Sequence, residues 1–184
     1  MTQKNELKCA KCPKTATTAI PYGERNYCDK HFLEFVEKRI RKDLRKSKPN
    51  IKQEQILLND DSTEYHITKY FLKEIYNDRL KFKESKDEPE CTIMPRTIGE
   101  ETTQFLEQFL SDKDMPVSRA INPLKHITPN ELKELCRILK IKYQKKENNE
   151  ILENLENSYP GTMFSAMKTK EFLEQEKNKK NKKM

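Results

Sequence analysis

The chain has 184 residues, with 37 Lys and Arg against 30 Asp and Glu, and therefore a formal net charge of +7. Only 34% of the residues are apolar, and the mean hydropathy is −1.03. This length excludes a full-sized two-domain enzyme, and the composition excludes a large apolar core. The three glycines are too few for a glycine-rich phosphate-binding loop.

No apolar run approaches the roughly 20 residues that cross a bilayer. Residues 1–6 also lack the apolar core of a signal peptide. We therefore expect a cytoplasmic protein with no membrane contact. In a reducing compartment the five cysteines are metal ligands or free thiols rather than disulfides.

Charge divides the sequence into three parts. Residues 1–50 carry 13 Lys and Arg against 6 Asp and Glu, whereas residues 51–175 carry 19 against 23. Residues 176–184 carry 5 lysines and 1 glutamate. We expect a basic N-terminal module at 1–49, a mildly acidic domain at 50–175 and a disordered lysine-rich tail at 176–184.

The N-terminal module contains paired metal-ligand residues. Cys9 and Cys12 form a CxxC pair, and fifteen residues later Cys28 and His31 form a CxxH pair. Two such pairs can close a tetrahedral Cys3His site, which is typical of Zn2+. Because all four positions come from the protein, the site is expected to be structural and not catalytic.

A basic helix is expected to follow the ligands. Apolar residues recur at helical spacing from Phe32 to Leu44, after short strands joined by a turn at 21–23, and Pro49 ends the helix. The opposite face carries Lys and Arg from Lys38 to Lys48. This face is a candidate phosphate-binding surface, and a solvated helix face with i,i+4 ion pairs is the alternative.

The second segment alternates short strands and helices, which indicates an α/β domain. Ser62 is an expected helix N-cap, and Thr128, Pro129 and Glu131 form an expected capping box. The predicted elements are a strand at 55–58, a helix at 64–78, a polar link at 84–90, a strand at 91–95, helices at 99–110 and 129–139, a strand at 141–143 and a helix at 161–174.

Four stretches of the sequence resemble a known family. They run from Cys9 to Arg45, from Ile56 to Ser62, from Thr97 to Leu106 and from Asn122 to Ile127. In this order they are similar to the tRNA 2-thiolation proteins of the PP-loop ATP-pyrophosphatase family. The resemblance implies an α/β fold in which a zinc-ribbon-like module and basic helix precede a shortened, degenerate PP-loop domain, similar to the adenine nucleotide alpha hydrolases.

The phosphate loop of that family is altered in this chain. The family pattern is Ser-Gly-Gly-x-Asp-Ser, but here Asn59, Asp60 and Asp61 precede Ser62. Without glycines the backbone cannot approach a pyrophosphate closely, and added carboxylates repel it. Cys91 and Cys136 stand alone after the metal module, and Cys136 is expected in the core. The sequence therefore predicts neither ATP binding nor a catalytic residue.

The resemblance implies a non-catalytic partner subunit of a cytosolic complex that thiolates the wobble uridine of tRNA. Such a chain would bind tRNA and stabilise a catalytic, ATP-dependent subunit, with exposed apolar positions of helices 64–78 and 161–174 facing that partner. The residues expected to contact tRNA are basic and lie in the first segment: Lys11, Lys14, Arg39, Arg41, Lys42, Arg45 and Lys46.

Two alternatives remain open from the sequence. The metal module and its basic helix also suit a stand-alone zinc-finger protein that binds nucleic acid or regulates a protein. A weakly active ATP-dependent enzyme is the other possibility, and saturable ATP binding would support it.

Overall fold

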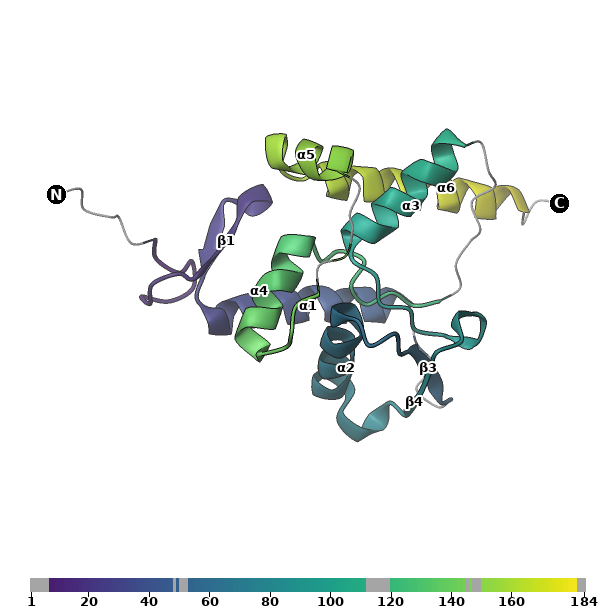
Figure 1. The fold of residues 1–184 in the computed structure, drawn as a ribbon, viewed down its shortest axis with the longest axis horizontal. Helices are drawn as coiled ribbons and strands as arrows, with labels where there is room; N and C mark the ends of the chain where they lie inside the picture. Colours follow the sequence, from purple (N-terminus) through teal and green to yellow (C-terminus); the bar gives the residue numbers. More distant parts are fainter. Residues whose placement is uncertain are drawn as a thin grey trace.

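The computed structural model describes residues 7–47, 49, 53–111, 120–144, 146 and 150–181. Its helices lie in three levels (Figure 1): α3, α5 and α6 at the top, α1 and α4 in the middle, and α2 with β3 and β4 below. No helix in these ranges is both long and apolar enough to cross a membrane.

The N-terminal module is a hairpin followed by a long helix. Strands β1 (Thr18–Ile20) and β2 (Arg25–Tyr27) pair antiparallel around the 3-10 turn η1 (Pro21–Gly23), as the sequence predicted. Helix α1 (Asp29–Ser47) begins directly after the hairpin and ends before Pro49. Phe32, Val36, Ile40 and Leu44 of its apolar stripe are fully buried, so this helix supplies one wall of the main core.

The second segment begins with a small parallel sheet. Strand β3 (Gln55–Leu58) pairs with β4 (Phe82–Ser85), and helix α2 (Thr63–Tyr76) with the 3-10 turn η2 (Asn77–Arg79) connects them. The Ser62 hydroxyl accepts a hydrogen bond from the Tyr65 N–H at 3.2 Å, which confirms the predicted N-cap. Strand β4 occupies the start of the segment predicted to be a polar link.

The other two predicted strands are absent from the described residues. Ile93 makes only isolated parallel bridges to Leu57 and Ile121, after a 3-10 turn η3 (Glu88–Glu90), so 91–95 adds backbone hydrogen bonds without forming a regular strand. Residues 141–143 run extended beside α2, where the Thr63 hydroxyl donates to the Lys142 carbonyl at 3.4 Å and accepts from the Gln144 N–H at 2.8 Å. These hydrogen bonds to the Thr63 side chain take the place of the backbone hydrogen bonds that a β-strand would make.

Four further helices complete the fold. Helices α3 (Ile98–Leu110) and α4 (Pro129–Leu139) each begin with a capping box, on Thr97 and Thr128. Helix α5 (Glu150–Ser158) was not predicted, and α6 (Thr162–Asn181) begins where the sequence indicated. Because α6 continues to Asn181, the helix extends into the segment that the sequence assigned to a disordered tail; residues 182–184 lie outside the described part.

The apolar surfaces are distributed differently from the sequence prediction. The apolar side chains of α2, including Tyr65, Ile67 and Phe71, are buried in the main core, so this helix exposes little apolar surface. On α6, Met163 and Met167 are buried in a second, smaller core with Ile98 and Leu152, while Phe172 is exposed. The expectation that helix 64–78 has an exposed apolar face is therefore wrong.

A buried ion pair joins the N-terminal module to α4. The Arg39 Nη2 of α1 donates to the Glu131 Oε2 at 2.6 Å, and the Tyr22 hydroxyl hydrogen-bonds to both side chains. The Arg39 side chain is 19% exposed and that of Glu131 is 3% exposed. Burial opposes the charge of Arg39, but Glu131 and Tyr22 raise the pKa of the guanidinium, so Arg39 stays charged.

Glu131 also closes the capping box of α4. Its Oε2 accepts the Thr128 N–H at 2.9 Å. Two further contacts lie nearby: Thr18 Oγ1 is 3.3 Å from Glu134 Oε2, and Arg137 Nη2 is 2.6 Å from Asp29 Oδ1. Arg39 is thus a joint between two parts of the molecule, and its contact with tRNA stays a prediction.

Removal of this joint is expected to destabilise the fold. Arg39→Ala leaves the buried Glu131 carboxylate without its counter-charge and should lower the free energy of unfolding by about 3 kcal/mol. Urea denaturation followed by circular dichroism measures this change. The matched control is Lys38→Ala, on the exposed face of the same helix, which should change stability by less than about 0.5 kcal/mol. Equal effects would contradict the role of Arg39.

Candidate functional site

The four predicted metal ligands converge at the base of the N-terminal module. Cys9 and Cys12 lie in the loop that precedes β1, Cys28 follows β2, and His31 is in the first turn of α1. The loop is closed by the Lys8–Thr15 bridge and by a hydrogen bond from the Cys9 N–H to the Lys14 carbonyl at 2.9 Å. One ligand atom from each residue lies within 4.8 Å of all the others.

The spacing of these atoms fits one tetrahedral metal ion. The Cys12 and Cys28 sulfurs are 3.7 Å apart, and the His31 Nδ1 is 3.4 Å from the Cys9 sulfur and from the Cys28 sulfur. A Zn–S distance of about 2.3 Å and a Zn–N distance of about 2.0 Å give tetrahedral edges of about 3.8 and 3.5 Å. These three separations match the tetrahedral edges, so the donor set suits a single metal ion.

The electrostatics of the cluster also favour a cation. Burial opposes ionisation of Cys9, but hydrogen bonds from the backbone N–H groups of Cys28 and Lys11, together with His31, lower the pKa of its thiol to about 6. The Lys14 N–H favours the Cys12 thiolate, but burial and the neighbouring sulfurs raise the pKa of Cys12. A bound cation would relieve that repulsion between adjacent thiolates.

The remaining two cysteines are buried thiols. Cys136 lies in the main core, as predicted, and burial together with the charge of Glu64 raises the pKa of its thiol to about 11. Cys91 is held against the Asp87 carbonyl oxygen at 3.2 Å, and burial and nearby carboxylates raise the pKa of its thiol as well. Neither environment favours a reactive thiolate.

The loop after β3 is closed by its own side chains. The Asp61 N–H donates to Asn59 Oδ1 at 3.2 Å, and the Ser62 N–H donates to Asp60 Oδ1 at 3.1 Å. The Asn59 amide also reaches Glu84 Oε2 at 2.9 Å. Asp61 has a positive φ of 55°, a conformation that favours glycine. Backbone groups that a phosphate would need are thus already hydrogen-bonded within the chain.

Carboxylates surround this loop. Asp60, Glu64 and Glu100 all face the Lys146 ammonium, and Asp61 Oδ1 lies 3.0 Å from the His66 ring. A nucleotide triphosphate with its magnesium would meet these negative charges directly. These residues do not suit a bound ATP, so we assign no nucleotide-binding site to the loop from Asn59 to Ser62.

The later stretches that carried the family resemblance lie side by side. Asn122 Oδ1 accepts the backbone N–H groups of Arg96 and Leu124 at 3.1 and 3.0 Å. Its Nδ2 donates to the Arg96 carbonyl at 2.8 Å and to Glu101 Oε1 at 2.9 Å. Asn122 therefore fixes the start of α3, and through it the position of Glu100 near the closed loop.

The predicted tRNA-contacting residues separate into paired and exposed groups. Arg39 is buried in the joint, Arg41 is 2.6 Å from Glu37 on the same helix, and Lys11 is 3.9 Å from Glu34. The exposed members are Lys14 in the metal-binding loop and Lys42, Arg45 and Lys46 at the end of α1. The second group is suited to a phosphate-binding surface. Binding of tRNA by any of the seven residues stays a prediction.

The sequence missed a cluster beside this end of α1. His126 Nδ1 is 2.7 Å from the buried Asp43 carboxylate, and Lys125 is 2.7 Å from Glu171 of α6. These residues are far apart in the sequence, so no local pattern indicated them. The cluster fastens α6 and the loop at 122–127 to α1 and so holds the basic end of α1 in place.

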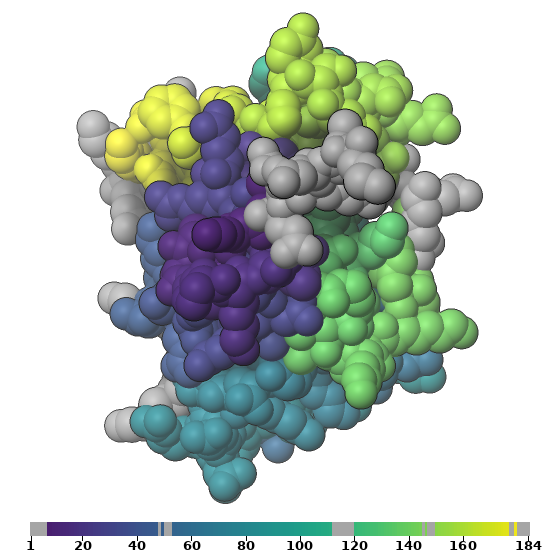
Figure 2. All heavy atoms as spheres, turned by 90° about the vertical axis from the view of Figure 1, so that its left-hand side faces the viewer, coloured from purple at the N-terminus to yellow at the C-terminus, as the bar shows by residue number. Residues whose placement is uncertain are grey.

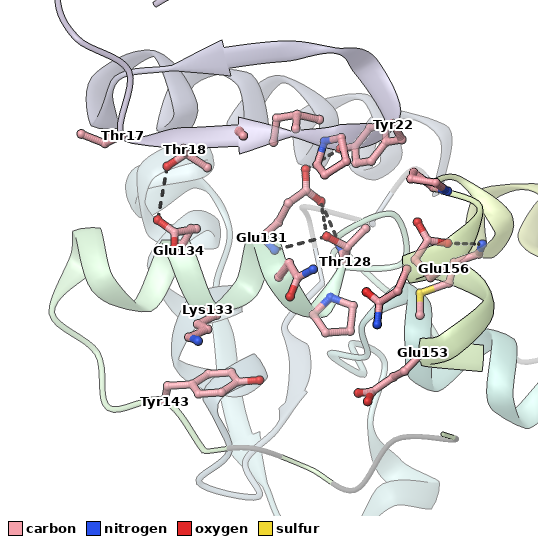
Figure 3. Close-up of a pocket in the computed structure, with 18 residues that line it drawn as sticks. Thr17, Thr18, Tyr22, Thr128, Glu131, Lys133, Glu134, Tyr143, Glu153 and Glu156 are labelled. Carbon is pink, nitrogen blue, oxygen red and sulfur yellow. Dashed lines mark hydrogen bonds between the residues drawn. The ribbon is translucent and has the colours of Figure 1, made fainter. Parts of the chain in front are cut away.

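One cavity of about 640 Å3 lies between β1, the start of α4 and the connection from α5 to α6. Figure 3 shows Tyr22, Thr128 and Glu131 on one side of it, with Glu153 and Glu156 on the other. Among the described residues that line it, the only basic one is Lys133. Its carboxylates make it unsuitable for phosphate groups.

The cavity and the metal module lie on one side of the molecule. In the space-filling view of Figure 2, the N-terminal module is beside α4, with α5 above them. This arrangement follows from the Arg39–Glu131 joint, which brings the hairpin against the start of α4.

No family model and no curated protein matches the sequence. Among solved structures, the chain is similar to the U34-tRNA thiolase NcsA from Methanococcus maripaludis, determined with its [4Fe-4S] cluster. The TM-score is 0.72, over 90% of this chain and 86% of that chain, at 16% sequence identity. The chain therefore shares the overall fold of that protein, and the predicted α/β fold class with an N-terminal Cys/His module is confirmed.

Substitution of a single ligand tests the metal site. Wild-type protein should contain one tightly bound metal ion per chain, and Cys28→Ser should retain less than about 0.1, because three ligands bind far more weakly than four. The variant should lose structure in the N-terminal hairpin and keep the helices beyond residue 55. Inductively coupled plasma mass spectrometry and circular dichroism measure both changes.

The control for this substitution is Cys91→Ser, which removes a buried thiol outside the cluster and should leave the metal content unchanged. Full metal content in Cys28→Ser would show that the assigned ligand set is wrong.

Proposed function

We propose that this chain acts in tRNA thiolation as a non-catalytic partner subunit, which binds tRNA and stabilises a catalytic, ATP-dependent subunit. The observation that carries the proposal is a thiolase fold whose loop after β3 is closed by carboxylates. The fold supports a role in thiolation. The closed loop supports the assignment of ATP chemistry to another chain.

The proposed metal is a structural Zn2+ held by Cys9, Cys12, Cys28 and His31. Three thiolates and one imidazole that converge on a single point suit zinc and leave no open position for a substrate. A [4Fe-4S] cluster takes four cysteine thiolates. Only Cys91 and Cys136 lie outside the Cys/His site, so the chain has no separate set of four cysteines for such a cluster. The metal would hold the hairpin and the start of α1 together.

The proposed tRNA contact is the exposed basic end of α1, with Lys14 of the metal-binding loop. Lys42, Arg45 and Lys46 lie within two turns of this helix and are all exposed. Phosphate contacts of this kind position an RNA and depend strongly on salt, without reading its bases.

The surface that we propose for the partner contact is formed by α3, α5 and α6, the upper level of helices in Figure 1. Large apolar side chains are exposed there, including Leu110 at 81%, Ile151 at 72% and Tyr159 at 70%. Exposed apolar side chains that gather on neighbouring elements mark protein interfaces. This location replaces the one that the sequence suggested on helix 64–78.

The tRNA contact is tested by charge removal. The triple variant Lys42→Ala, Arg45→Ala, Lys46→Ala should weaken binding of unfractionated tRNA at least about tenfold at 0.1 M salt and should reduce the slope of log K against log salt by about 2. Fluorescence anisotropy measures both quantities. The control, Lys73→Ala, Lys81→Ala, Lys83→Ala, removes the same charge from exposed positions near α2 and β4. Equal losses would contradict a specific surface.

ATP is expected not to bind. Isothermal titration with ATP and Mg2+ should show no saturable heat up to about 1 mM, because the loop N–H groups are occupied and the nearby carboxylates repel phosphate. Saturable binding in this range would favour an ATP-dependent enzyme over a partner subunit.

A further inference from the structure

The outer side of α5 carries exposed apolar side chains. Ile151, Leu155 and Tyr159 are spaced four residues apart, and they are 72%, 42% and 70% exposed. The Tyr159 N–H donates to the Leu155 carbonyl at 2.8 Å, so the helical turn continues as far as Tyr159. Residues four apart lie one above the other on a helix. The three side chains therefore form one row, which we call the α5 ridge.

Other side chains of α5 hold the helix in place. Leu152 is 3% exposed and lies in the second core with Met163 and Met167 of α6. The Glu156 carboxylate accepts the Gly161 N–H and the Met163 N–H, both at 2.8 Å, and so fixes the connection from α5 to α6. The α5 ridge is thus part of a fixed element, which a partner would not have to order on binding.

The fold itself does not use the α5 ridge. In the described part of the chain, neither core includes any of its three side chains. The space-filling view of Figure 2 shows α5 at the top of the molecule, where its side chains are open to a partner. Exposed apolar side chains that gather on one surface mark a site of protein binding.

The shape of the α5 ridge favours a helix as the binding element. Side chains at four-residue spacing form ridges that pack into the grooves of a second helix. A helix that packs in this way presents apolar residues at spacings of three, four and seven. An added strand would instead need the free backbone groups of a sheet edge, which α5 does not offer.

The charge of α5 indicates which kind of helix fits. It contains Glu150, Glu153 and Glu156 and no lysine or arginine, although the whole chain has a net charge of +7. A second copy that paired through the same helix would bring like charges together, which opposes association. Basic side chains beside the apolar positions of a partner helix would instead complement the glutamates.

We propose that the α5 ridge binds an amphipathic helix of another protein, whose apolar stripe is flanked by lysine or arginine. This inference rests on the partner contact proposed above: it places that contact on α5 and states the chemistry of the element that binds there. The apolar stripe covers Ile151, Leu155 and Tyr159, and the basic side chains lie beside the exposed Glu150. The contact uses neither the metal ligands nor the basic end of α1.

The experiment titrates the full-length chain, purified with its Cys/His site loaded, into a fluorescein-labelled peptide. The probe is two copies of Leu-Lys-Lys-Leu-Leu-Lys-Leu, which form an amphipathic helix with a basic face. Fluorescence anisotropy at about 0.1 M salt should show saturable binding. A peptide with glutamate in place of every lysine should bind at least about tenfold more weakly, because its charge repels α5.

Substitution locates the binding surface. The double variant Ile151→Ser, Leu155→Ser should bind the lysine peptide at least about tenfold more weakly than wild type. The matched control, Leu110→Ser, Phe172→Ser, removes two exposed apolar side chains from α3 and α6 and should bind as wild type. Absence of saturable binding, equal affinity of the two peptides, or equal affinity of wild type and the folded double variant would each overturn the inference.

A second measurement uses only wild-type protein, in case the double variant does not fold. The lysine peptide should slow hydrogen–deuterium exchange of the backbone amides at 150–159; protection confined to other segments would overturn the inference. Sedimentation velocity tests the other occupant: a wild-type dimer that the double variant cannot form would show that a second copy covers the α5 ridge, and would also overturn it.

Failure of this inference is distinguishable from failure of the proposed function. Capture of a thiolation subunit by wild type and by the double variant alike would overturn the inference alone. Capture by wild type of other proteins without that subunit would count against the proposed function.

Discussion

The ion pair of Arg39 with Glu131 connects the two parts of this molecule. It joins α1, which begins at the metal ligands, to α4, whose capping box uses the same glutamate. The Tyr22 hydroxyl adds the hairpin to the same contact. Because Glu131 is buried and Arg39 is mostly buried, removal of either charge leaves the other uncompensated. The metal module is therefore fixed to the α/β body, and a surface that spans both can bind a ligand as one unit.

Other pairs of charged side chains also join distant elements of the chain. With few apolar residues, the protein relies on a modest core and on buried polar contacts: Arg39 with Glu131, His126 with Asp43, and Lys146 with Glu64. Each contact joins elements that are distant in sequence. The loop after β3 shows the consequence for function, since its N–H groups and carboxylates are satisfied internally. The fold is similar to that of a solved tRNA thiolase, and the loop's own side chains bond the N–H groups at the place where the family resemblance would position a phosphate.

The sequence predicted the features that depend on local patterns. The spacing of Cys9, Cys12, Cys28 and His31 indicated a cluster that the structure brings together, and the capping residues located the starts of α2 and α4. Strand β4 was missed because its polar residues form a strand only through pairing with β3. The partners of Arg39 and Lys146 were missed because long-range ion pairs leave no periodic signal. For that reason a basic stripe on α1 could not be divided into buried and exposed members from the sequence alone.

We propose that this chain, whose fold is similar to that of a tRNA thiolase, works with a catalytic subunit and not by itself. The most direct test is affinity capture of the tagged full-length protein from its native cell at low salt, with mass spectrometry of the proteins and sequencing of the RNA. If this proposal is right, the capture recovers an ATP-dependent tRNA thiolation subunit with an intact phosphate loop, together with tRNA that is released as the salt is raised. Recovery of DNA or of unrelated proteins, with neither that subunit nor tRNA, would contradict it and favour a stand-alone zinc-finger protein.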